Sequence, residues 1–486
     1  MATVLATAEP LKKPCPVTGG WLPQSPQARI DFLKVILDEG REYRKHHKLG
    51  AVEELDPTVA DLKNLIEDSA QLSMLFKSMF EEIPFSHRND PIGKAYNITN
   101  YDQLLQHFNM LLTEPPRYNE NLIIALPFTL LLEWPMATRG GLAAFLDKDV
   151  NAKIGAILNK WGEYLEDPNR DSKKYLVNNP KDRNSWLSQS ARDIMRKRDP
   201  KHREFEDLYE CDPQDKHLGF TTWDHFFTRQ FKDYKKVRPV ENPEDNYISS
   251  GCESAPYAIK QLVKMKEKFW IKGQPYSLRH MLASEEDAKK FAGGTVYQAF
   301  LSPLTYHRWH SPINGYITKL RLVSGSYFSI SPINAFPDPE TFANTQSQPY
   351  LSAVATRALI FLENSTVGEM VMIPVGMVEV STCEFNKTIL DQMKVDPQDP
   401  TGQTWIPKGN RVEVSKGDEL GMFHFGGSTH CLVFQPQVEL RFWQRAIPLD
   451  TEDNYFVPLN ATLAEVRQRT PEEMEYLLSF AEDYME

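Results

Sequence analysis

The hydrophobic pattern of this chain changes near its middle from a helical period to a strand period, and this change constrains the fold most. After Pro239 the apolar residues form short runs between Gly, Pro, Asn and Asp, as strands joined by turns do. We therefore predict an α+β fold with a tail (1–28), a helical N-terminal domain (29–215) and a β-rich domain (216–486). Between residues 27 and 208 apolar residues recur three to four positions apart, for example at Ile30, Leu33, Ile36 and Leu37, at Leu62, Leu65 and Ile66, and at Leu104, Leu105, Phe108 and Leu111.

The sequence pattern also predicts where the connections and the strands lie. The charged stretch 166–206 is predicted to form exposed connections around one helix at 186–195. Two segments without periodicity, 332–349 and 396–410, are predicted to be loops. Strands are predicted around residues 270–271, 295–297, 316–317, 358–362, 370–375, 377–380, 412–414 and 432–434.

Composition and charge exclude several classes of protein. A formal net charge of −11 disfavours nucleic-acid binding and adhesion to anionic membranes, because both need clustered basic residues. The longest apolar run, 122–132, has 11 residues and contains Pro127, whereas a membrane span needs about 20 apolar residues. No secretory signal pattern is visible at the start, so we expect a cytoplasmic protein without stable membrane insertion. The five cysteines lack a C-x-x-C pair and are expected to be reduced thiols.

Ser428 follows two glycines and is a candidate for attack on its own backbone. Gly426 and Gly427 have no Cβ to hinder a hydroxyl approaching the preceding carbonyl, and they tolerate strained backbone angles. Taken alone, the tetrapeptide that ends at Thr429 is more often an ordinary turn. The interpretation of Ser428 as a self-cleaving residue therefore needs support from the rest of the chain.

The segment 302–312 contains two histidines. Ser302 can cap a helical turn and Pro303 can occupy its first position. On such a turn His307 and His310 share a face, so both imidazoles could address one reacting centre. A metal site would need a third ligand, and none accompanies the pair at a recognisable spacing. We therefore predict no metal.

The segment 219–231 predicts a helix that docks on the β-rich domain. Thr222 is a plausible cap, and Asp224 and Arg229 are expected on the solvated or paired face. The aromatic stripe is expected to be core and consists of Trp223, Phe226, Phe227 and Phe231.

Together these segments resemble the phosphatidylserine decarboxylase family. That family carries a Phe-Phe-x-Arg helix followed by Arg-Pro, then Tyr-His-Arg-x-His-x-Pro, and finally Lys-Gly-x-Glu-Leu-Gly-x-Phe running into Gly and Ser-Thr. Here these motifs stand at 226–229 with 238–239, at 306–312, and at 416–423 running into 427–429. The resemblance covers roughly 219–442. The helical N-terminal region, with the segments 306–310, 381–384 and 421–428, is similar to a soluble fungal branch that includes L-tryptophan decarboxylases and acts on free amino acids.

The resemblance implies a covalent pyruvoyl cofactor made from Ser428. The chain would cut itself between Gly427 and Ser428 into a β chain (1–427) and an α chain (428–486). His310 matches the family base for self-cleavage, and His307 matches the residue thought to act in decarboxylation. We expect four further residues to line the substrate pocket, namely Tyr306, Trp309, Cys383 and Glu384.

One position departs from the family pattern. The family places an aspartate before the sheet domain, where it orients the base histidine as in a Ser-His-Asp arrangement. Cys252 falls on that position here, and the nearest carboxylate is Glu253. We hypothesise that Glu253 orients His310. Three other histidines are expected to be structural, namely His225, His424 and His430.

Three functions remain open from the sequence. The first is a pyruvoyl-dependent decarboxylase of a free aromatic L-amino acid, best L-tryptophan to tryptamine. The second is a phosphatidylserine decarboxylase making phosphatidylethanolamine, which would need a lipid-contacting surface. The third is an unprocessed, non-catalytic relative. The expected partners are a small-molecule amino acid and the chain's own α and β chains, without nucleic acid; a homo-oligomer is compatible with the sequence.

Overall fold

The structure is a computed structural model. It describes residues 26–47, 55–83, 98–119, 126–266, 276–329, 348–376, 379, 382–409, 411–424, 428–449, 456–480 and 485.

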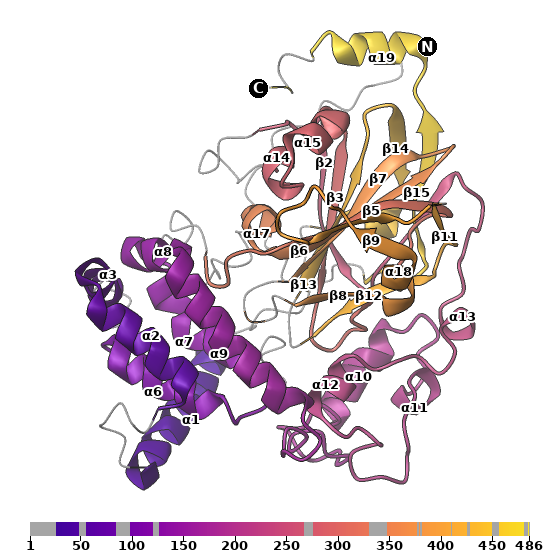
Figure 1. Ribbon diagram of the computed structural model, residues 1–486. Helices are drawn as coiled ribbons and strands as arrows, with labels where there is room; N and C mark the ends of the chain where they lie inside the picture. The colour runs from indigo at the N-terminus through magenta and orange to yellow at the C-terminus, as the bar shows by residue number, and fades with distance from the viewer. Residues whose placement is uncertain are drawn as a thin grey trace.

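The N-terminal part is helical and lies beside one end of a large sheet (Figure 1). Side-chain caps begin several helices, and they include Asp56 before α2, Asn100 before α6 and Asp147 before α9. Helix α9 contacts α2 and α8, and α1 contacts α6 and α7. The helices are α1 (Pro26–His47), α2 (Pro57–Asp68), α3 (Ala70–Glu81), α6 (Tyr101–Leu111), α7 (Pro127–Met136), α8 (Arg139–Leu146) and α9 (Lys148–Glu166).

Short helices connect this part to the sheet. The predicted helix at 186–195 is corrected to α10 (Gln189–Arg198), because Ser188 accepts a hydrogen bond from the Ala191 N–H and caps it there. The predicted aromatic helix is α12 (Trp223–Phe227), with Thr222 as its cap; its core role is confirmed because Trp223, Phe226 and Phe227 are buried. Two more short helices are α11 (Phe205–Leu208) and α13 (Tyr234–Val237).

The β-rich part is built on one antiparallel sheet in the order β2-β3-β13-β7-β6-β5-β10-β9, with β11 paired to β5. Strand β13 lies between β3 and β7, and all its residues are buried. The strands of this sheet are β2 (Ala255–Gln261), β3 (Thr295–Leu301), β5 (Gly315–Val323), β6 (Thr356–Asn364), β7 (Gly368–Gly376), β9 (Met393–Val395), β10 (Thr404–Pro407), β11 (Val412–Val414) and β13 (Ser428–Phe434).

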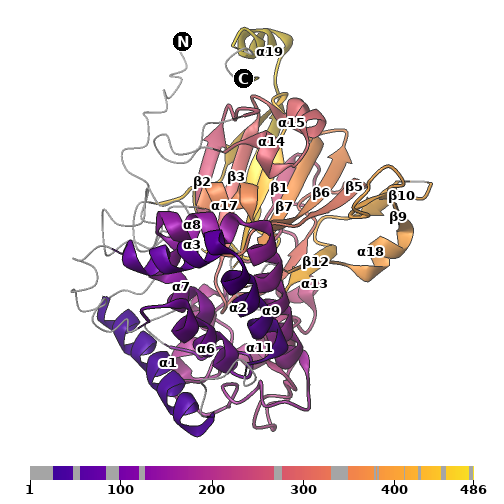
Figure 2. The same cartoon turned by 60° about the vertical axis from the view of Figure 1, so that its left-hand side comes forward.

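Elements on both faces bury this sheet. Along one face lie α14 (Leu278–Met281), α15 (Glu285–Phe291) and α17 (Gln348–Val354), as Figure 2 shows. Tyr297 of β3 stacks on Phe442 of a three-stranded sheet, at 5.8 Å between ring centroids. That second sheet consists of β1 (Tyr247–Ser249), β15 (Thr462–Gln468) and β14 (Val438–Phe442).

A third, three-stranded sheet lies at the end of the large sheet nearest α10 and α12 (Figure 1). It has the order β4-β12-β8, with β4 (Arg308–His310), β12 (Glu419–Phe423) and β8 (Cys383–Phe385). The remaining elements are α18 (Lys387–Gln392), η3 (Gln444–Ala446) and α19 (Pro471–Leu478).

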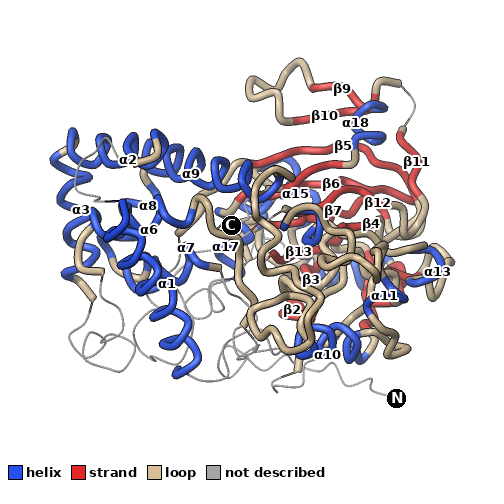
Figure 3. Tube along the Cα trace, turned by 90° about the horizontal axis from the view of Figure 1, so that it is seen from below, coloured by secondary structure: helices blue, strands red, loops and turns tan. Residues whose placement is uncertain are grey.

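The helical part also contacts the loop that follows β5. Asn151 of α9 donates to the Gly325 carbonyl and accepts from the Tyr327 N–H, at 3.0 and 3.1 Å. The ring of Phe145 in α8 packs at a tilt against that of Phe328, with 6.0 Å between the ring centroids. Figure 3 shows the N-terminal helices α1 to α8 gathered on one side of the strands. Among the described residues, none of the helices combines the length and the apolar character needed to cross a membrane.

The α+β prediction is confirmed. The predicted strands at 295–297, 316–317, 358–362, 370–375, 412–414 and 432–434 are confirmed, whereas 270–271 lies outside the described residues and only Glu379 is described within 377–380. The predicted loop 396–410 is wrong at residues 404–407, which form β10 and pair with β5 and β9. Of the predicted loop 332–349, residues 332–347 lie outside the described part, and Pro349 belongs to α17. The boundary at residue 215 stays a prediction.

Candidate active site

Ser428 is the first residue of the buried strand β13. It pairs with Leu301 of β3 and with Gly376 of β7. Its side chain is fully buried, and its Oγ has no hydrogen-bond partner among the described residues. A buried hydroxyl without a partner is rare, and a chemical role is one reason for it. Gly426 and Gly427, before it, lie outside the described residues.

Strand alternation places Ser428 and His430 on the same face of β13. Leu432 shares that face and pairs with Met372 of β7. A Cβ on Gly251 would lie 2.7 Å from Met372 Cε, so the backbone at Gly251 covers this face closely. The Gly251 carbonyl in turn accepts from the His310 N–H at 2.8 Å. The His310 backbone therefore belongs to the layer that covers the Ser428 face.

The predicted helical turn through His307 and His310 is wrong. A turn does form at Ser302, whose carbonyl accepts from the Thr305 N–H at 2.9 Å. Residues 308–310 then pair with β12 as strand β4, and extended backbone turns positions three apart to opposite sides. The ring of His307 stacks on Phe227 at 3.8 Å, whereas the ring of His310 lies against Tyr306 and Tyr234.

His310 is held as a neutral base by the protein backbone. Its Nδ1 lies 2.7 Å from the Gly417 carbonyl oxygen, which can only accept, so Nδ1 carries the proton. Nε2 keeps its lone pair and lies 3.2 Å from the Tyr306 hydroxyl. Burial lowers the pKa of His310 to about 4. The ring is therefore neutral at pH 7, with Nε2 as the basic nitrogen.

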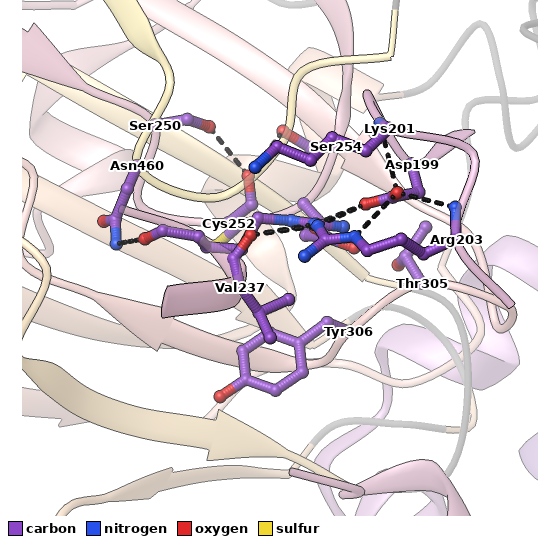
Figure 4. A network of polar contacts seen from close by, with 12 residues as sticks. Asp199, Lys201, Arg203, Val237, Ser250, Cys252, Ser254, Thr305, Tyr306 and Asn460 are labelled. Atoms are coloured by element: carbon purple, nitrogen blue, oxygen red, sulfur yellow. Dashed lines mark hydrogen bonds and ion pairs between the residues drawn. The ribbon is translucent and has the colours of Figure 1, made fainter. Parts of the chain in front are cut away.

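The hypothesis that Glu253 orients His310 is corrected by these contacts. Glu253 accepts from Arg238 Nε at 2.5 Å, and Arg238 Nη1 donates to Asp199 at 2.7 Å. The neighbours of this buried network are drawn in Figure 4. Cys252 is fully buried, and burial raises the pKa of its thiol, so no charge stands at the family's aspartate position. The carbonyl of Gly417 orients His310 instead.

His307 is fully buried beside a buried cation. Neither of its ring nitrogens makes a hydrogen bond of normal geometry with the described residues. Burial, together with the charge of Arg229, holds the pKa of His307 well below its usual range. Arg229 is itself buried and donates to the carbonyls of Leu304 and Thr305 at 2.7 and 2.9 Å. Of the two alternatives predicted for Arg229, solvated or paired, the structure shows the paired one, and Arg229 braces the turn before His307.

The four predicted pocket residues have different surroundings. Tyr306 is buried, stacks on Phe231 at 4.3 Å and reaches His310. Trp309 packs between Phe385 and Phe423 in the small sheet. The Cys383 thiol is buried, with Sγ 3.7 Å from the Pro374 carbonyl oxygen. The side chain of Glu384 is half exposed and pairs with His424.

Sequence reasoning missed Glu379, which lies three residues after the partner of Ser428 in β7. Its carboxylate accepts from the Thr129 N–H at the start of α7. Helix α7 has no side-chain cap of its own from Leu126, so Glu379 supplies one. Burial raises the pKa of Glu379 to about 8. The contact between Glu379 and Thr129 joins the helical part to the Ser428 end of the sheet. In the sequence, only the position of Glu379 shortly after β7 could have indicated this contact.

Two family models, both described as phosphatidylserine decarboxylase, match residues 56–195 and 223–447. The decarboxylase iboD of Amanita muscaria is 37% identical over 71% of this chain and 92% of its own length. An L-tryptophan decarboxylase of Psilocybe cyanescens is 31% identical over 92% of this chain and 94% of its own length. A phosphatidylserine decarboxylase proenzyme of Shewanella sediminis is 30% identical over 47% of this chain and 75% of its own length.

Proposed function

Because the chain belongs to the phosphatidylserine decarboxylase family, and is thus a carboxy-lyase, we propose that it decarboxylates a free aromatic L-amino acid with a pyruvoyl group made from Ser428. The single observation that carries the proposal is the Ser428 hydroxyl, which is fully buried and without a partner among the described residues. L-tryptophan, giving tryptamine, is the substrate favoured by the similarity to the Psilocybe cyanescens decarboxylase.

The proposed maturation uses His310 as the base. Ser428 Oγ attacks the carbonyl carbon of Gly427, its proton passes to Nε2 of His310, and the 427–428 C–N bond breaks with protonation of the released amine. The chain is then joined by an ester. Loss of the Ser428 Cα proton breaks the Cβ–Oγ bond and releases residues 1–427 with a terminal carboxylate. Water then replaces the nitrogen of the remaining unsaturated residue, ammonia leaves, and the pyruvoyl group heads residues 428–486.

The geometry of His310 fits this role. The Gly417 carbonyl fixes the proton on Nδ1, so Nε2, which faces the Tyr306 hydroxyl, is the nitrogen that can accept a proton. The low pKa of about 4 keeps the ring neutral at the pH of the reaction. A proton taken from Ser428 is therefore easily passed on to the leaving amine.

The pyruvoyl group, once formed, serves as the electron sink for the carbanion left when CO₂ departs. We propose that His307 delivers the proton that replaces CO₂ at the substrate Cα. Support comes from its fully buried ring, whose nitrogens have no hydrogen bond of normal geometry with the described residues. Stacking on Phe227 fixes the plane of the ring. The same burial keeps bulk water away from that proton.

A free amino acid is proposed rather than a lipid. The similarity to the L-tryptophan decarboxylase extends through the helical part, whereas the similarity to the bacterial phosphatidylserine decarboxylase proenzyme covers 47% of the chain. We further propose a cytoplasmic enzyme whose β and α chains stay associated, since the α chain would begin with β13 at the centre of the sheet. Among the proposed pocket residues, Tyr306 contacts the ring of His310, with its hydroxyl 3.2 Å from Nε2.

The test combines intact mass with product analysis. We expect two chains split between residues 427 and 428, the smaller with a blocked terminus, and amine production from tryptophan above that from tyrosine or phenylalanine. Phosphatidylserine in detergent micelles is offered in parallel. Decarboxylation of phosphatidylserine without any decarboxylation of the amino acids would favour the alternative that the protein is a phosphatidylserine decarboxylase. A folded, uncleaved chain without activity would instead indicate an unprocessed, non-catalytic relative.

A further inference from the structure

His424 lies between two carboxylates that come from different parts of the fold. Its Nδ1 is 2.9 Å from Asp224 Oδ1 in α12, and its Nε2 is 2.9 Å from Glu384 Oε2 in β8. The side chains of His424 and Asp224 are only 10% and 13% exposed, so water screens this contact weakly. His424 follows β12 directly and is the last described residue before Ser428.

These contacts make His424 an imidazolium. A carboxylate oxygen can only accept a hydrogen bond, so both ring nitrogens must donate, and a ring with two N–H groups carries a positive charge. Burial alone would lower the pKa of His424, but Asp224 and Glu384 raise it to about 9. The histidine predicted to be merely structural is therefore a buried cation.

Other charged or titratable side chains lie around this cluster, on α9, α12 and β4. Glu166, at the end of α9, has a carboxylate oxygen within 4.8 Å of Asp224 and His424 ligand atoms. On α12 itself, His225 has a pKa lowered by burial and is expected to be neutral. Arg308 of β4 is paired with Glu419. A metal ion bound here would need the lone pair of a His424 ring nitrogen. Each of these nitrogens instead faces a carboxylate oxygen. We therefore assign His424 and its neighbouring carboxylates as an ion-pair cluster.

The chain between His424 and Ser428 contains the bond that the proposed maturation cuts. At its far end, Ser428 is fixed by pairing with β3 and β7. At its near end, His424 is fixed by one ion pair to α12 and one to β8. Holding His424 and Ser428 in place lowers the entropy cost of bringing the Ser428 hydroxyl to the preceding carbonyl.

We propose that the charged His424 is a positioning residue for self-cleavage, tying the scissile segment to Asp224 of α12 and Glu384 of β8. This inference rests on the proposed function. Helix α12, which carries Asp224, contacts α9, and Glu166 of α9 lies beside the cluster, so the helical part borders the group that holds His424.

The experiment follows self-cleavage of freshly synthesised chain by gel and intact mass between pH 6 and pH 10. His424→Gln, which cannot carry the charge, is expected to cleave at least about tenfold more slowly. The wild-type chain is expected to lose cleavage at high pH, where His424 loses its proton. Asp224→Asn keeps the shape and removes one carboxylate, so this loss should occur at a lower pH than in the wild-type chain. His424→Arg keeps a permanent cation with donors for both carboxylates, so it should restore cleavage and should not show this loss. His225→Gln, a neighbouring histidine outside the cluster, is the matched control and should match the wild type.

Each outcome has a defined meaning. Circular dichroism shows whether each variant is folded. A folded His424→Gln chain that cleaves at the wild-type rate, or an Asp224→Asn chain with an unchanged pH limit, overturns the positioning role and leaves the proposed function standing. If His424→Gln does not fold, the positioning role is tested by Asp224→Asn alone, through the pH above which that variant stops cleaving. A wild-type chain that never cleaves overturns the proposed function itself, and the inference with it.

Discussion

Replacing Glu253 by Ala separates a structural role from a catalytic one. The structure pairs this carboxylate with Arg238, and the side chains of Glu253 and Arg238 are each 4% exposed. Arg238 keeps Asp199 as a second partner in the variant. Breaking a buried ion pair costs about 3–5 kcal/mol, and losing one charged hydrogen bond costs about 1.5–3 kcal/mol. We therefore expect Glu253→Ala to lower the free energy of unfolding by about 3 kcal/mol.

The assay measures stability and cleavage separately. Urea unfolding is followed in a Ser428→Ala background, where the chain stays intact, and the initial rate of self-cleavage is followed with Ser428 present. Since the Gly417 carbonyl holds His310, folded Glu253→Ala protein should cleave at the wild-type rate. Glu163→Ala is the control: its surface pair with Lys160 is 47% and 69% exposed, so it should cost less than about 1 kcal/mol.

One result would refute this reasoning. A Glu253→Ala chain with unchanged stability but slow cleavage would mean that Glu253 acts on His310 during the reaction, as the sequence alone suggested. The contacts of the resting structure would then be rearranged before the cut.

Three further predictions concern the site. Ser428→Ala should give a single uncleaved chain by intact mass and no amine product, and any cleavage at 427–428 would remove Ser428 as the nucleophile. His310→Ala should block cleavage, whereas His307→Ala should still yield two chains but lose decarboxylation; the reverse pattern by gel and product assay would exchange their roles. Burial raises the pKa of Glu379 from 4.5 to about 8, so the folded state holds a proton that the unfolded chain has lost, and stability should fall as pH rises between these values. Glu379→Gln in the Ser428→Ala chain should remove most of that fall in urea titrations, and an unchanged pH dependence would contradict the assignment.

Local signals in the sequence predicted the helical part, several strands and the candidate serine. Helical spacing predicted the N-terminal helices, since it depends on neighbours within four positions. The predicted runs at 295–297, 370–375 and 432–434 became β3, β7 and β13. Motif order over the second half pointed to Ser428, His307 and His310 before any geometry was known. The turn predicted through the two histidines failed because pairing with β12 overrode local propensity.

What the sequence determined by itself was the order of helices and strands, the family and the candidate serine. Only the tertiary structure decided which groups meet. His310 finds the Gly417 carbonyl 107 residues away, and Glu253 is taken by Arg238 rather than by His310. His424 reaches Asp224 across 200 residues and becomes charged through that contact. A local pattern cannot encode such pairings, because hydrogen bonds and ion pairs depend on distances in space that only the packed sheets and helices fix.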